Sequence, residues 1–292
     1  MGPPRYDTVS FLSDYGRTDE FVGVVHSVIR QLAPGVGVVD VTHDIPPFDV
    51  RAGGLALARS APYLCPGVVL AVVDPGVGTA RRAVAVEVGG GTAVLVGPDN
   101  GLLAPAVALV GGATRAVVLD NPEYHLEGRA LFDGRDVFGP AAAYLCQGIA
   151  LEELGTEIDP AGMVPGLMPV AREEDGSVVA EVLWVDRYGN AQLNVDPDEL
   201  DPFGSRFELK VTAGRWTGVR ADAFAGVVPG TVGMVTDSSG LLALVGDRSS
   251  AAEELGLAAG DEVVVTPIQG EVEDAPAVEV RLGRRPDDGG RS

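Results

Sequence analysis

The sequence contains few cysteines and histidines, and both scarcities limit the chemistry that it can perform. Its 292 residues include two cysteines, Cys65 and Cys146, and three histidines, His26, His43 and His125. The cysteines form no CxxC pattern, which predicts two buried thiols in a reducing compartment. None of the histidines stands in ligand spacing, so the sequence predicts no metal site.

Positive charge is also scarce, with 21 Lys and Arg against 42 Asp and Glu and a net charge of -21. Without a basic patch to neutralise phosphates, a nucleic-acid partner is not expected. The apolar runs are well short of the ~20 residues of a membrane span, and residues 1–16 lack the apolar core of a signal peptide. These features predict a cytoplasmic protein without a membrane partner. A hydrophobic fraction of 46% at this length predicts a globular chain with room for two domains.

The most informative stretch is 68–82, with the sequence VVLAVVDPGVGTARR. Its β-branched run 68–73 predicts a buried strand of a parallel sheet. Asp74 follows at the carboxyl edge of that strand, where open α/β sheets bind their ligands. Arg81 could fold back across the Pro-Gly turn to meet Asp74. The stretch alone is equally compatible with a turn that Asp74 only caps.

Strands alternate with helices in the first half of the chain, which predicts a doubly wound, mostly parallel α/β sheet. A glycine-rich hairpin joins 83–88 to 92–96. The other predicted strands are 8–12, 35–41, 68–73 and 116–119, and the predicted helices are 20–32, 50–61, 102–110 and 137–146.

Residues 157–176 break this pattern with Pro-Gly pairs and a charged turn, which predicts a linker between an N-terminal domain (1–156) and a C-terminal domain (177–269). Short, evenly spaced strands in the second domain indicate a small β-barrel or a sandwich. Residues 270–292 lack core-forming density and are predicted to be a frayed tail. The strands expected in the second domain are 177–185, 191–195, 206–211, 232–236, 241–245 and 262–267.

Several loop residues have both a functional and an ordinary structural interpretation. Asp14 could accept both hydroxyls of a ribose or cap the helix that begins near residue 20. Tyr188 offers a stacking face and Asn190 a pair of hydrogen-bonding groups for a base, but 186–190 could also be a plain β-turn. The segments 98–101 and 237–240 are turns on composition alone. His43 is expected to hold its loop together by hydrogen bonds.

Taken in order, these segments resemble one family, the S-adenosylmethionine (SAM) hydroxide adenosyltransferases, which are related to fluorinase and chlorinase. The resemblance covers residues 8 to about 268. It implies an N-terminal α/β domain, a C-terminal β-barrel and a homotrimer that binds SAM between subunits, without a cofactor. The segments that carry it are SDYG (13–16), DVTHDIPP (40–47), DPGVGT (74–79), PDNGLL (98–103), GRD (134–136), YGN (188–190) and DSSG (237–240).

The resemblance also implies an activity, the hydrolysis of SAM to adenosine and L-methionine by attack of water at the ribose C5′. Asp74 and Arg81 match the first two members of the family's Asp-Arg-His catalytic set, and Asp133 stands where the histidine is expected. Ser239 stands where the fluorinase has an arginine. The substrate contacts implied are Asp14 for the ribose hydroxyls, Phe48 and Tyr188 beside the nucleoside, Asn190 and Arg248 at the adenine, Asp186, Ser238 and Ser239 at the methionine end, and also Val77, Asn100 and Gly134.

Asp74 is expected to orient the water, while Arg81 fixes the carboxylate and lowers its pKa. Asp133 could share a proton with Asp74. Two other functions stay open from the sequence. One is a SAM-dependent halogenase, against which Asp74 argues because it would repel a halide. The other is a protein that binds SAM or adenosine without catalysis.

Overall fold

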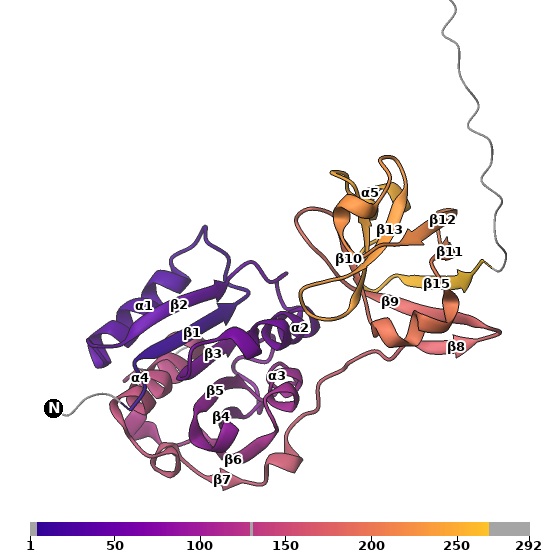
Figure 1. The fold of residues 1–292 in the computed structure, drawn as a ribbon. Helices are drawn as coiled ribbons and strands as arrows, with labels where there is room; N and C mark the ends of the chain where they lie inside the picture. The colour runs from indigo at the N-terminus through magenta and orange to yellow at the C-terminus, as the bar shows by residue number, and fades with distance from the viewer. Residues whose placement is uncertain (1–4, 129–130, 269–292) are drawn as a thin grey trace, which may run out of the picture.

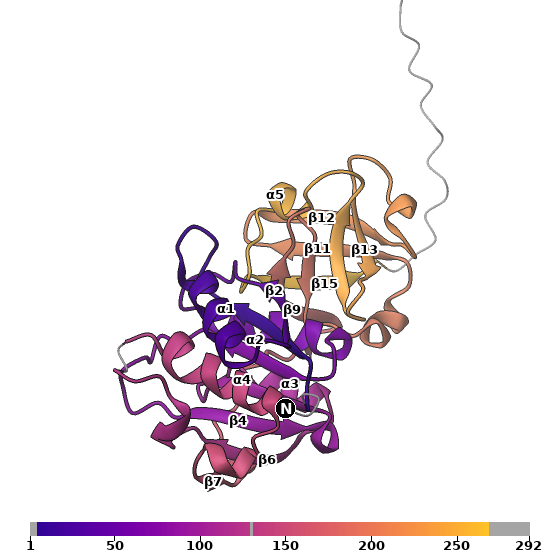
Figure 2. The ribbon, with the colours of Figure 1, turned by 90° about the vertical axis from the view of Figure 1, so that its left-hand side faces the viewer.

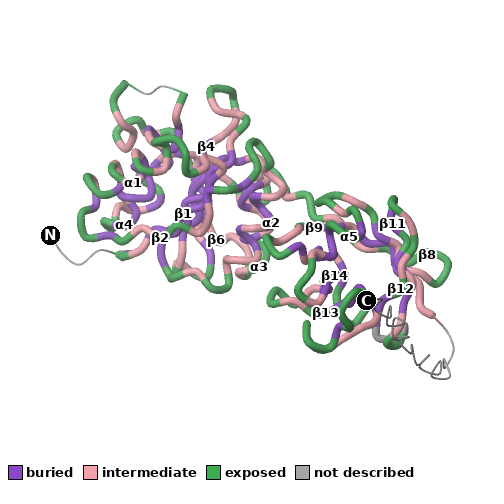
Figure 3. The backbone as a smooth tube through the Cα atoms, turned by 90° about the horizontal axis from the view of Figure 1, so that it is seen from above, coloured by how far each residue is buried: buried purple, intermediate pink, exposed green. Residues whose placement is uncertain are grey.

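The structure is a computed structural model that describes residues 5–128 and 131–268, and it contains two lobes (Figure 1). The predicted tail, 270–292, lies outside the described residues. Each lobe has a buried interior of its own (Figure 3). Cys146 is buried in the first lobe as predicted, but Cys65 is exposed, so the prediction of a buried thiol there is wrong. Within the described ranges, no helix combines the length and apolar character needed to cross a membrane.

The first lobe is built on a seven-stranded sheet with the order β2-β1-β3-β5-β4-β6-β7. The pairings among β2, β1, β3 and β5 are parallel, whereas β4, β6 and β7 join antiparallel. The predicted α/β fold class is confirmed. The strands are β1 (Thr8–Ser13), β2 (Gly37–Thr42), β3 (Val68–Val72), β4 (Ala83–Val88), β5 (Ala93–Pro98), β6 (Ala113–Val118) and β7 (Glu157–Ile158).

Helices cover both faces of this sheet (Figures 1 and 2). Helices α1 and α4 pack together on one face, and α2 and α3 pack together on the other. A π-helix at Gly134–Phe138 leads directly into α4. The helices of the first lobe are α1 (Phe21–Leu32), α2 (Val50–Ser60), α3 (Ala104–Leu109) and α4 (Gly139–Gln147).

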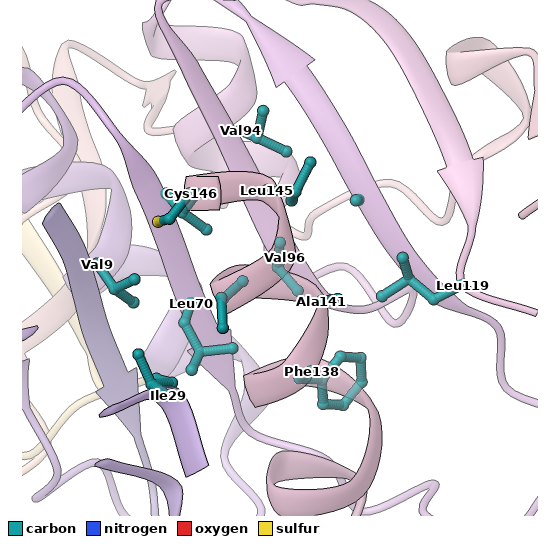
Figure 4. Packing of buried hydrophobic residues seen from close by; sticks show 14 of the residues in the cluster. Val9, Ile29, Leu70, Val94, Val96, Leu119, Phe138, Ala141, Leu145 and Cys146 are labelled. Atoms are coloured by element: carbon teal, nitrogen blue, oxygen red, sulfur yellow. The ribbon is translucent and has the colours of Figure 1, made fainter. Parts of the chain in front are cut away.

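Strand β3 is buried on both faces, which is why its sequence shows an unbroken apolar run. Leu70 packs in one cluster with Ile29 of α1 and Phe138 (Figure 4). The alternate residues Val69 and Ala71 belong to the cluster on the opposite face, with α2 and α3. Packing on both faces therefore fixes the end of the strand that Asp74 follows.

The second lobe is a barrel of seven strands in the order β10-β14-β13-β12-β11-β15-β9, closed by pairing of β9 with β10. Closure decides between the two architectures that the sequence left open. Strand β8 adds to β9 outside the ring. The elements are β8 (Arg172–Glu174), β9 (Ser177–Val185), β10 (Ala191–Leu193), β11 (Arg206–Val211), β12 (Gly214–Arg220), β13 (Val232–Thr236), β14 (Leu242–Gly246), β15 (Glu262–Pro267) and helix α5 (Ala251–Leu255).

Three strands and one helix were missed by the sequence analysis: β7, β8, β12 and α5. Strands β7 and β8 lie in the predicted linker and pair with β6 and β9. In β12, two glycines weaken the strand pattern, but Gly218 is needed because a Cβ there would lie 2.3 Å from the Phe207 ring. The domain boundaries stay predictions. Short 3-10 helices occupy Ala61–Tyr63, Gly89–Gly91, Pro122–Tyr124, Leu151–Leu154, Pro160–Gly162, Pro197–Phe203 and Phe224–Gly226.

Helix α2 connects the two lobes through two arginines. Arg51 lies 2.5 Å from Glu181 of β9, and the guanidinium of Arg59 lies 4.2 Å from the ring centroid of Trp184. The first contact is an ion pair and the second a cation–π contact. Both β9 residues belong to the barrel, so the first and last turns of α2 each contact it.

We expect Leu70→Ala to lower the free energy of unfolding of the first lobe by about 2–5 kcal/mol, because the side chain is fully buried in β3. The control is Leu109→Ala, since Leu109 is 63% exposed and its loss should cost less than about 0.5 kcal/mol. Urea unfolding followed by helical circular dichroism measures both. Equal losses for the two variants would contradict the assignment of β3 as the centre of the core.

Candidate active site

Two carboxylates follow neighbouring parallel strands where the strand order reverses. Asp14 follows β1 and Asp74 comes shortly after β3, and the Asp14 N–H donates to Val72 O at 3.3 Å. Such a switch point is where open α/β sheets bind ligands. A cleft of about 460 Å³ lies there, and it brings together six residues predicted from the sequence: Asp14, Phe48, Asp74, Val77, Asp133 and Gly134.

Arg81 folds back under the cleft and joins two carboxylates, as its position after the turn suggested. Its Nε donates to Asp74 Oδ1 at 3.0 Å, and its Nη2 donates to Asp74 Oδ2 and, at 2.8 Å, to Asp133 Oδ2. All three side chains are less than one-tenth exposed. The guanidinium also lies 5.3 Å from the centroid of the Phe138 ring. Asp74 therefore does more than cap a turn.

The Pro-Gly turn after β3 is shaped for this contact. The Val77 N–H donates to Asp74 O at 3.3 Å and the Thr79 N–H to Gly76 O at 3.1 Å, which reverses the chain. A Cβ on Gly76 would lie 3.3 Å from the Cβ of Arg81. Glycine at this position therefore lets the arginine approach the carboxylate closely.

Burial raises the pKa of the Asp74 carboxyl above its usual value. The Arg81 guanidinium acts in the opposite direction, and the Asp133 carboxylate adds to the rise. We expected Arg81 to lower this pKa; its own effect has that sign, but the net shift is upward because desolvation is larger. Burial and the nearby carboxylates also raise the pKa of Tyr15, so its phenol stays protonated and can donate.

Asp14 positions the rim of the cleft. Its Oδ2 accepts the Phe48 N–H at 2.9 Å, and this bond holds Phe48 at a φ of +68°, with its side chain exposed. The N-cap of α1 is Glu20, which makes no side-chain cap. The interpretation of Asp14 as a helix cap is therefore wrong.

Aromatic residues that the sequence analysis did not single out line the same cleft. The Tyr15 ring centroid lies 5.6 Å from that of Phe132 and 5.8 Å from that of Phe21. A Cβ on Gly134 would lie 2.1 Å from the Tyr15 hydroxyl oxygen, so this wall requires glycine there. The signal available in the sequence was adjacency, because Tyr15 follows Asp14 and Phe132 precedes Asp133.

A second pocket, on the barrel, gathers four further predicted residues: Asp186, Asn190, Ser238 and Ser239. Asp186 Oδ1 accepts the N–H groups of Tyr188 (2.8 Å) and Asn190 (2.9 Å), and Oδ2 accepts Asn190 Nδ2 at 2.8 Å. Asp186 thus organises the turn that carries Asn190. Trp184 lines the same pocket and was missed.

Four predicted residues line neither pocket: Arg81, described above, and Asn100, Tyr188 and Arg248. Asn100 donates through Nδ2 to Val73 O at 2.9 Å and accepts the Leu102 N–H at 3.1 Å, so its side chain stabilises its own turn. Tyr188 is 75% exposed on the barrel. Arg248 has a φ of +55° in the loop before α5.

The cleft and the barrel pocket lie at opposite ends of helix α2. Phe48, two residues before the helix, lines the cleft, whereas Arg59 in its last turn contacts Trp184 of the barrel pocket. Eleven helical residues span about 16 Å. Within one chain, the two groups of predicted site residues therefore lie apart, with helix α2 between them.

Comparison with known proteins decides the family. Residues 9–155 match the SAM hydroxide adenosyltransferase N-terminal domain, and residues 180–264 match the corresponding C-terminal domain. The chain belongs to the SAM hydroxide adenosyltransferase family. The resemblance inferred from the ordered segments is thereby confirmed.

Individual relatives agree with this assignment. It is 43% identical over 259 residues to an "(R)-S-adenosyl-L-methionine hydrolase" of Salinispora tropica, covering 88% of this chain and 97% of the relative. A fluorinase of an Actinoplanes species is 27% identical, over 70% and 76% of the two chains. The crystal structure of an uncharacterized conserved protein from Thermotoga maritima has a TM-score of 0.82 at 30% identity, covering 88% and 99%.

We expect Asp133→Asn to lower the pKa of Asp74, because it removes a neighbouring negative charge, and Arg81→Gln to raise it, because it removes the cation. Carboxyl ¹³C NMR titration measures both shifts. The resonance of Asp74 is assigned as the one that disappears in the Asp74→Asn variant.

The control variant is Asp175→Asn, in the turn between β8 and β9, which should leave the pKa of Asp74 unchanged. Asparagine suits this position because Asp175 has a φ of +49°. Shifts of the same sign for Asp133→Asn and Arg81→Gln would contradict the electrostatic account.

Proposed function

We propose that this protein hydrolyses SAM to adenosine and L-methionine. One observation carries the proposal: a buried Asp74–Arg81–Asp133 cluster at a sheet switch point, beside Asp14. A relative at 43% identity that covers most of the chain and bears the name of a SAM hydrolase supports it.

The reaction needs placement of one water more than it needs a strong base, because the sulfonium is already a good leaving group. The water oxygen bonds to C5′ as the C5′–S bond breaks, and the sulfur keeps the electron pair to become the thioether of methionine. Asp74 orients this water and accepts the proton that it loses, before release to solvent. Holding a reactant in line is worth many kcal/mol of the barrier. A raised pKa makes Asp74 a better acceptor than an ordinary ion-paired carboxylate.

The charge of the cluster favours water over a halide. Two carboxylates and one guanidinium have a net charge of about −1 when Asp74 is ionised, which attracts a sulfonium and repels an anion. We infer that Asp133 in place of the family histidine strengthens this bias, with Arg81 bridging both acids. The proton shared between Asp74 and Asp133 stays a prediction.

We infer that the substrate's other contacts come from the barrel of a neighbouring subunit in a homotrimer. The separation of the two pockets by helix α2 supports this arrangement. The cleft then supplies Asp14 for the ribose and Phe48 for the nucleoside, and the barrel supplies Asn190, Ser238 and Ser239. A cytoplasmic location, to which the two unpaired cysteines are suited, belongs to the same proposal.

Purified protein should release adenosine and methionine from SAM in equal amounts, with ¹⁸O from labelled water in the 5′-hydroxyl. Asp74→Asn should lower kcat by about 10²–10⁴-fold, because an amide cannot accept the proton that the water loses. Liquid chromatography with mass spectrometry measures the products, and Asp175→Asn is the matched control. Binding of SAM without methionine release over hours, or formation of 5′-chloro-5′-deoxyadenosine in chloride, would overturn the proposal.

The shared site predicts complementation between two inactive variants, Asp74→Asn in the cleft and Ser239→Trp in the exposed barrel loop. After co-refolding of equal amounts, about one quarter of the sites (one half times one half) should combine an intact cleft with an intact barrel pocket. Adenosine formation measures the regained activity, and each variant refolded alone is the control. No regain in verified mixed oligomers would contradict a site between subunits.

A further inference from the structure

A group of side chains of the types that bind metal ions lies next to the loop that carries Asp14 and Tyr15. It contains His26 of α1, Asp40 of β2 and His43 of the loop after β2, and their ligand atoms all lie within 4.8 Å of one another. The Nε2 atoms of His26 and His43 lie 2.8 and 3.0 Å from the same atom, Asp40 Oδ1. Sequence spacing predicted no metal site because the two histidines come from separate segments, and only Asp40 and His43 are close in sequence.

His43 is held as a metal-binding histidine usually is. Its side chain is fully buried, and its Nδ1 lies 2.8 Å from Ser13 Oγ, which also accepts the Tyr15 N–H at 3.3 Å. Its Nε2 faces Asp40 but lies off the direction of a hydrogen bond, and it has no hydrogen-bond partner. A buried ring nitrogen without a partner is costly, and a cation at this point would satisfy it. The Ser13 hydroxyl can accept a hydrogen bond from Nδ1–H, and in that tautomer Nε2 carries the lone pair that coordinates a cation.

The other two proposed ligands, His26 and Asp40, are partly exposed to solvent. The side chains of His26 and Asp40 are 33% and 29% exposed, which leaves a path for an ion and room for water. Asp40 contributes a carboxylate oxygen to the group, which together with two imidazoles is a donor set that binds divalent cations.

We propose that His26, Asp40 and His43 bind one zinc ion, with water in the remaining position. Two imidazoles and a carboxylate are typical zinc ligands, with bonds of about 2.0–2.2 Å. Ligand atoms in a tetrahedral site of that size are about 3.3 Å apart, so the observed 2.8 and 3.0 Å require only small adjustments.

The site would brace the loop that carries the substrate-facing residues. Ser13, which contacts His43, directly precedes Asp14, and the Gly16 N–H donates to His43 O at 2.8 Å. The zinc would thus act through the position of Asp14 and Tyr15, and it would not touch the substrate.

The test uses the full chain, freed of metal with a chelator and dialysed against Zn²⁺ or Co²⁺. We expect one ion per chain by elemental analysis, ligand-field absorption with Co²⁺, and a thermal midpoint that rises with Zn²⁺ concentration. His26→Gln should weaken binding of the ion at least tenfold. The Co²⁺ absorption and the rise of the thermal midpoint with Zn²⁺ should then be lost. Asp40→Asn is a second variant of nearly equal volume, and circular dichroism verifies that both fold.

His125→Gln is the matched control, because the third histidine lies outside the cluster and its Nε2 lies 3.2 Å from Leu119 O. It should bind the ion as the unchanged chain does. The proposal is overturned if the unchanged chain binds no more Zn²⁺ than His26→Gln, which would leave a hydrogen-bonded cluster only, or if His125→Gln loses the ion equally. These readouts do not depend on SAM hydrolysis, so either proposal can fail without the other.

Discussion

The contact between Arg81 and two buried carboxylates is the interaction on which the catalytic cleft depends. Asp74 and Asp133 come from distant parts of the chain, and each would be costly to bury alone. One guanidinium offsets only part of that cost, and the remaining negative charge suits a sulfonium substrate. The same burial that makes the cation necessary also raises the pKa of Asp74. Structure and reactivity thus have one physical origin.

The fold places this cluster by a general property of parallel sheets. Strands β1 and β3 are neighbours, but the chain leaves them towards opposite sides, so their carboxyl ends open a cleft. Helix α2 then contacts the barrel along its length, which sets the barrel pocket at the far end of the helix from the cleft. The two pockets of one chain are therefore apart, which is the basis of the proposal that the substrate binds between subunits.

Much of the first lobe was predictable because its signals are local. The apolar run of β3, the Pro-Gly turn after it and the helical spacing of α1 all depend on residues close in sequence. Strand β12 was not predictable, because its glycines are explained only by the Phe207 ring of the neighbouring strand. The lowering effect of Arg81 on the pKa of Asp74 was predicted correctly, but the larger, opposite effect of burial was missed, because burial depends on side chains from many segments.

The sequence by itself determined the order of elements, the acid after the third strand, the arginine that meets it and the family. Only the tertiary structure decided that the barrel closes, that Asn100 stabilises its own turn, and that His26 and His43 converge on Asp40. The physical reason is the distance along the chain over which each effect acts. Propensity and periodicity act over a few residues, whereas closure, desolvation and ligand clusters depend on pairs of residues that are neighbours only in the folded chain.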